Sequence, residues 1–78
     1  MTEIQYAKDE IAQEILVCLM QDYNMTMQQA LSTLYNSVLF EKLQDNATGL
    51  YFQSPYYCYE LLENELKYGK IQGATKRN

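Results

Sequence analysis

Apolar residues in the first third of the chain recur in steps of three and four. One row comprises Ile4, Ala7, Ile11, Ile15, Cys18 and Leu19, and a second row beside it comprises Ala12, Leu16, Met20 and Tyr23. This spacing places apolar side chains on one face of an α-helix. The pattern therefore predicts a long amphipathic helix from Thr2 to about Tyr23.

A polar break at residues 22–24 separates this helix from a second one. Thr26 and Gln29 match a capping box, in which each side chain accepts a hydrogen bond from the other residue's backbone N–H. The apolar residues that follow share one face: Met27, Ala30, Leu31, Leu34 and Tyr35. After an interruption at residues 36–37, residues 38–43 can form two further turns. We expect a separate short helix there, capped by Ser37, in preference to a bent continuation of the second helix.

Residues 45–49 have the polar composition of a helix end and loop, in which Gly49 can adopt a positive φ. Residues 50–53 are the only segment with strand-like content, and four residues without a second strand cannot form a sheet. We therefore expect a short extended connector at residues 50–53.

Ser54 and Pro55 predict the start of the last helix, because the serine can cap it and proline suits its first position. The helix is expected to run to about Tyr68 and to end at Gly69. Its apolar stripe comprises Cys58, Leu61, Leu62 and Leu66, extended by Tyr59 and Tyr68. The chain is thus predicted to be all-α: a small bundle of three main helices plus one short helix. We expect one helical domain over residues 1–72 and a flexible C-terminal tail at residues 73–78.

Charge is distributed unevenly along the 78 residues. Residues 1–66 contain two lysines against all ten acidic residues, a net charge of −8. Such a surface repels phosphate backbones, so nucleic acid is an unlikely partner for this part of the chain. The alternative is a small regulator that contacts nucleic acid through the basic C-terminal residues Lys67, Lys70, Lys76 and Arg77.

The residue types restrict the chemistry. The chain has no histidine, which excludes Ser-His and Cys-His nucleophilic pairs and His-ligated metal sites. Its three glycines form no phosphate-binding loop, and two cysteines cannot complete a zinc site. Glu10 with Glu14, and the group Glu60, Glu63 and Glu65, are interpreted as solvated helix faces. We expect no enzyme activity, no cofactor, no metal and no small-molecule substrate.

The cysteines and the N-terminal sequence bear on the compartment. Cys18 and Cys58 each lie in an apolar helical pattern, which favours two buried thiols over a disulfide. No apolar run suits a signal peptide or a membrane span, so we expect a cytoplasmic protein with no membrane partner.

Five aromatic residues fall within nine positions around the only proline: Tyr51, Phe52, Tyr56, Tyr57 and Tyr59. Helix positions 56, 57 and 59 point in different directions, so these three rings cannot all face one core. Tyr59 lies on the apolar stripe and is predicted to be buried. The other rings either cap a thin core or form a protein contact surface. Under the second interpretation the contact residues are Tyr51, Phe52, Tyr56, Tyr57 and Tyr68.

Five segments form a recognisable combination: the N-terminal amphipathic helix and the sequences at residues 30–35, 40–43, 49–51 and 59–62. Over roughly residues 10–68, this combination resembles a family of small uncharacterised bacterial helical domains, a domain of unknown function. The resemblance implies a partner-binding or antitoxin-like role and supplies no catalytic residues. We therefore expect a non-enzymatic protein–protein interaction module that binds a protein partner or forms a homodimer.

Overall fold

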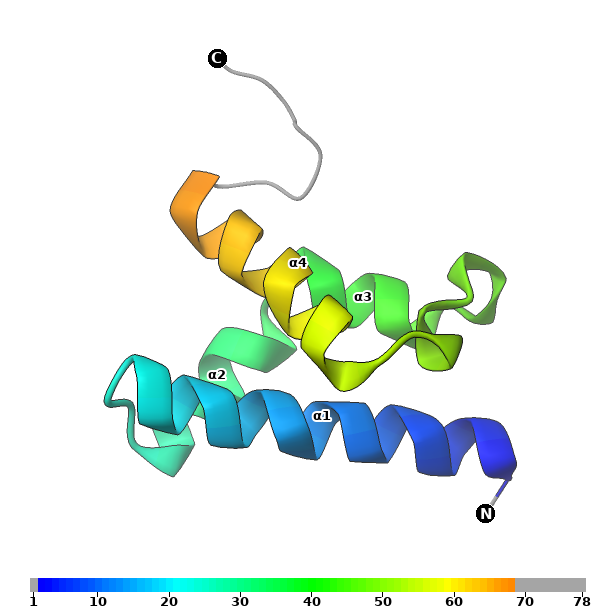
Figure 1. Ribbon diagram of the computed structural model, residues 1–78, viewed down its shortest axis with the longest axis horizontal. Coiled ribbons are helices and arrows are strands. Elements are labelled where there is room, and N and C mark those ends of the chain that lie inside the picture. The colour runs from blue at the N-terminus through cyan, green and yellow to red at the C-terminus, as the bar shows by residue number, and fades with distance from the viewer. Residues whose placement is uncertain (1, 69–78) are drawn as a thin grey trace.

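The computed structural model describes residues 2–68, which form four α-helices, two short 3₁₀ helices and no strand (Figure 1). The elements are α1 (Glu3–Asp22), α2 (Met27–Tyr35), α3 (Val38–Gln44), η1 (Asn46–Thr48), η2 (Leu50–Phe52) and α4 (Pro55–Tyr68). The prediction of an all-α bundle with three main helices and one short helix is confirmed. The predicted cap at Gly69, the domain end at residue 72 and the tail at residues 73–78 lie outside the described residues.

The predicted helix starts are confirmed by their hydrogen bonds. Thr26 and Gln29 form both bonds of the capping box at the start of α2. The Ser37 hydroxyl accepts from the N–H of Phe40 at 3.0 Å, so α3 is a separate helix. The Ser54 hydroxyl accepts from the N–H of Tyr57 at 3.1 Å, and Pro55 is the first residue of α4. These starts are local features, which is why the sequence reveals them.

The helix α1 lies along one edge of the molecule, with α3 and α4 on one side of it, while α2 passes behind the C-terminal part of α1 (Figure 1). The buried apolar side chains of the described residues form one core cluster. They are Ile11, Ile15 and Leu19 of α1, Ala30 and Leu34 of α2, Leu39 and Leu43 of α3, Leu50 of η2, and Cys58, Tyr59 and Leu62 of α4. As predicted, Tyr59 belongs to this core. None of the helices within residues 2–68 has both the length and the apolar content needed to cross a lipid bilayer.

The expected extended connector at residues 50–53 is wrong, because residues 50–52 form the 3₁₀ helix η2. Gly49 has a φ of 69°, a left-handed conformation that turns the chain just before it. The N–H groups of Phe52 and Gln53 then donate to the carbonyls of Gly49 and Leu50, both at 3.0 Å. Burial of Leu50 in the core stabilises this turn, and strand propensity carries no information about such tertiary burial.

The short helix α3 is bound at each end by a charged side chain from another helix. The Glu65 carboxylate of α4 accepts from the N–H groups of Val38 and Leu39, at 2.8 and 3.0 Å. At the opposite end, the Lys8 ammonium of α1 donates to the carbonyl of Gln44 at 3.0 Å. A negative group at a helix N-terminus and a positive group at its C-terminus both interact favourably with the helix dipole and so stabilise the helix. A helix of seven residues is too short to be stable alone, so α3 depends on these tertiary contacts.

The interpretation of Glu65 as part of a solvated face is therefore wrong, and the role of Lys8 was missed. Both side chains occupy positions within the apolar stripes of their helices: Lys8 is seven residues before Ile15, and Glu65 is seven residues after Cys58. Lys8 is buried, and Glu65 is half-buried. A single charge inside an apolar stripe is the sequence signal that could have identified each of them.

Candidate functional site

Four of the five predicted contact residues are exposed. The exposed fraction is 80% for Phe52, 77% for Tyr68, 69% for Tyr56 and 44% for Tyr57. Tyr51 is half-buried and packs against the core. Two tyrosines outside this set, Tyr6 and Tyr35, are also exposed, so exposure alone does not identify a contact surface.

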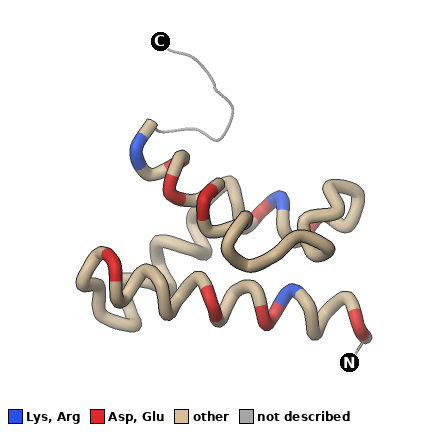
Figure 2. Tube along the Cα trace, viewed as in Figure 1, with Lys and Arg blue, Asp and Glu red and all other residues tan. Residues whose placement is uncertain are grey.

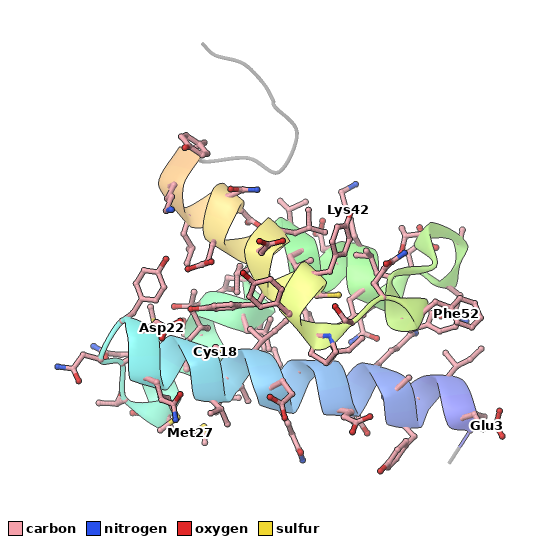
Figure 3. All side chains as sticks on the ribbon, in the orientation of Figure 1. Glu3, Cys18, Asp22, Met27, Lys42 and Phe52 are labelled. Atoms are coloured by element: carbon pink, nitrogen blue, oxygen red, sulfur yellow. The ribbon has the colours of Figure 1, made fainter. Side chains whose placement is uncertain are left out.

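The structure divides these five residues among separate places. Tyr56 and Tyr57 are in the first turn of α4, where successive side chains point about 100° apart. Tyr68 is the last residue of α4, about 18 Å further along the axis at a rise of about 1.5 Å per residue. Phe52 lies at the end of the molecule where α1 begins, close to Glu3 (Figure 3). The five residues therefore do not form one continuous surface.

Tyr51 and Phe52 form the most compact part of the set. Their ring centroids are 4.5 Å apart with planes inclined by 38°. Together with Ile4, Ala7 and Glu3 of α1 they line a shallow hollow between η2 and the first two turns of α1. We call these five residues the aromatic hollow. Because Tyr51 is anchored in the core, it holds the exposed Phe52 ring in place beside an apolar depression.

Phenol and carboxylate groups line the junction of α1 and α4, toward the other end of α1. The Tyr59 hydroxyl donates to the Asp22 carboxylate at 2.8 Å, and burial and this bond raise the pKa of Tyr59 well above its usual range. The Tyr23 hydroxyl donates to Glu63 at 3.5 Å, and burial followed by the negative charge of Glu63 raises the pKa of Tyr23. Each of these hydrogen bonds ties α1 to α4. Sequence reasoning did not find these pairs, because their members are 37 and 40 residues apart in the chain.

The same junction is a region of negative potential. Burial raises the pKa of the Cys18 thiol, and the charges of Asp22, Glu14 and Glu63 raise it further. The charge of Glu60 raises the pKa of the exposed Tyr56. Acidic positions recur along α1 and α4, whereas basic ones are few (Figure 2). Residues 2–68 contain ten acidic side chains and three lysines, so their net charge is −7.

Both cysteines are free thiols, as expected, with Cys18 half-buried and Cys58 buried. The Cys58 thiol donates to the carbonyl of Leu50 at 3.7 Å, which joins α4 to η2. Within residues 2–68 no three His, Cys, Asp or Glu side chains are grouped so that they could hold a metal ion. Of the four basic residues proposed to contact nucleic acid, only Lys67 belongs to the described part of the chain.

The chain was compared with protein-family models, with curated proteins and with solved structures, and none of the three comparisons found a match.

Proposed function

We propose that the protein is a non-enzymatic interaction module that binds a protein partner through the aromatic hollow. The observation that carries this proposal is the Phe52 side chain, which is 80% exposed although the neighbouring Tyr51 ring, 4.5 Å away between centroids, packs against the core. Interface centres are enriched in aromatic residues, and a few such residues provide most of the binding free energy. Since Tyr51 restricts the Phe52 ring before binding, less conformational entropy is lost when a partner binds.

The alternative role of capping the core accounts for Tyr51 but not for Phe52. A tyrosine at a core edge buries its ring and leaves its hydroxyl in water, and half-buried Tyr51 fits this description. Phe52 has no polar group to hydrate, and most of its ring surface contacts no other part of residues 2–68. Its position is therefore better explained by a partner than by the fold. An antitoxin-like or regulatory role is the form of partner binding that the family resemblance implies.

Phe52→Ala and Tyr68→Ala form a matched pair of variants for testing this proposal. Both remove a highly exposed ring, but Tyr68 lies at the far end of α4. Substitutions at such exposed positions change stability by about 0.5 kcal/mol or less, which thermal unfolding would check. Tagged forms of the natural sequence and of both variants would be used to capture partners from lysates of cells that naturally express the protein. A partner identified by mass spectrometry would then be purified and its affinity measured by isothermal titration calorimetry.

We expect Phe52→Ala to weaken the binding of the purified partner at least about tenfold, the effect of losing an interface residue worth about 1.4 kcal/mol or more. Tyr68→Ala should bind within about twofold of the natural sequence. If Phe52→Ala captures the same proteins with the same affinity, the aromatic hollow is not the binding site and the proposal is wrong.

A further inference from the structure

A row of glutamates extends from the aromatic hollow along α1. Glu3, Ala7, Glu10 and Glu14 follow one another in steps of four, three and four residues, so they share one face of the helix. Glu3 and Ala7 line the hollow, and the three glutamates are exposed. The row spans about 16 Å at about 1.5 Å per residue. We call Glu3, Glu10 and Glu14 the glutamate row.

No cation within the described residues neutralises this row. Lys8 is buried and donates to the carbonyl of Gln44. Lys42 belongs to α3 and Lys67 to the last turn of α4, so both are on other elements (Figure 2). Glu14 also contributes to the negative potential that raises the pKa of Cys18. This face of α1 is therefore apolar at the end next to the aromatic hollow and negatively charged along the rest of its length.

We propose that the aromatic hollow and the glutamate row together bind a basic amphipathic segment of a protein partner. An apolar side chain of that segment would occupy the hollow against Phe52, and Lys or Arg side chains spaced over about 16 Å would lie along the glutamate row. This inference rests on the proposed function, whose partner it describes. Residues 2–68 of a second copy do not have this chemistry, because they would bring another net charge of −7 to the same surface.

Fluorescence anisotropy with synthetic peptides tests the inference. The probe is a labelled 12-residue peptide with Leu and Phe on one helical face and Lys on the other. One comparison peptide has Glu in place of every Lys, and another has Ser in place of every Leu and Phe. We expect the Lys peptide to bind at least about tenfold more tightly than either, and its affinity to fall as NaCl is raised from 50 to 300 mM, because screening weakens attraction between exposed charges.

Two double variants with the same change in net charge test where the peptide binds. Glu10→Gln with Glu14→Gln removes charge from the glutamate row. Glu41→Gln with Glu60→Gln removes it from exposed positions on two other helices, α3 and α4. The first pair should weaken binding of the Lys peptide at least about fivefold and the second less than about twofold, since the Debye length at 0.1 M salt is only about 10 Å. Equal effects of the two pairs, or equal binding of the Glu peptide, would overturn the inference.

Two further results separate this inference from the proposed function and from another occupant. A natural partner whose affinity depends on Phe52 but is unchanged by salt and by the Glu10 and Glu14 substitutions would refute the basic segment and leave the proposed function standing. The chain's own final residues also contain cations, at Lys70, Lys76 and Arg77. If replacing all three by Ser increased the affinity for the Lys peptide tenfold, the surface would already be occupied by the chain itself, and a partner segment would not be its main occupant.

Discussion

Truncation of Glu65 tests whether α3 depends on a charged side chain supplied by α4. The substitution Glu65→Ala removes the acceptors of two hydrogen bonds and leaves the N–H groups of Val38 and Leu39 without a protein partner. A hydrogen bond to a charged group contributes about 1.5–3 kcal/mol, and the favourable interaction with the helix dipole adds about 0.3–1 kcal/mol. Because these amides are only partly buried, water can hydrogen-bond to them in the variant and recover part of the lost hydrogen-bond energy. We expect the free energy of unfolding to fall by about 2–3 kcal/mol.

This loss is large for a chain of 78 residues, whose total free energy of unfolding is expected to be about 4–12 kcal/mol. The corresponding decrease in the midpoint temperature is about 10–20 °C. Glu65→Gln keeps one acceptor oxygen but loses the charge, so its cost should be about 1–2 kcal/mol. Urea unfolding followed by far-UV circular dichroism measures these values. Native-state hydrogen exchange should show faster exchange at Val38 and Leu39 than in the natural sequence.

Glu60→Ala is the matched control, because Glu60 is an exposed carboxylate on the same helix. Its removal should change the free energy of unfolding by about 0.5 kcal/mol or less. If the Glu65 and Glu60 variants unfold at the same urea concentration, the hydrogen bonds to α3 do not stabilise the fold, and the argument for a tertiary cap fails.

Three other predictions concern the turn, the core phenol and the thiols. Gly49→Ala should lower the free energy of unfolding by about 1–2 kcal/mol, measured by urea unfolding. The φ of Gly49 is 69° and an added Cβ would meet only open space, so the loss comes from backbone strain alone. An unchanged urea midpoint would contradict this. The pKa of Tyr59 is raised in the folded protein, so an unfolded phenol ionises first and the free energy of unfolding should fall as the pH rises above about 10. Urea unfolding between pH 8 and 11 should show a shallower fall for Tyr59→Phe, and an equal slope would refute the role of this phenol. Burial raises the pKa of both thiols, so Ellman's reagent at pH 8 should modify Cys18 slowly and Cys58 only when the protein unfolds. The variant Cys18→Ser leaves Cys58 as the only thiol and serves as the control. Rapid modification of Cys58 in the folded protein would contradict its burial.

The candidate site was predictable from the sequence only as a list of residues. Composition singled out Tyr51 and Phe52, but it also grouped them with Tyr68, which lies at the opposite end of α4. The hollow includes Ile4 and Ala7 from a helix that begins nearly fifty residues earlier. Which distant residues complete a surface depends on how helices pack, and neither composition nor periodicity encodes that packing.

By itself, the sequence determined the features that depend on neighbours within a few residues. The apolar spacing of three and four residues determined the helices. The caps at Thr26, Ser37 and Ser54 determined where three of these helices begin, and Gly49 determined a turn. These features are local because a helix and its cap are formed by groups within about four positions of one another.

Only the tertiary structure decided the roles of the charged residues inside the apolar stripes. Lys8 and Glu65 are fifty-seven positions apart, and they act together because α1 and α4 bring them to the two ends of α3. The same packing buried Leu50, replaced the expected connector by η2, and left the Phe52 ring exposed. A charge is stable within an apolar stripe when an opposing helix end supplies its partner, and the position of that helix end is fixed by the packing of the whole chain.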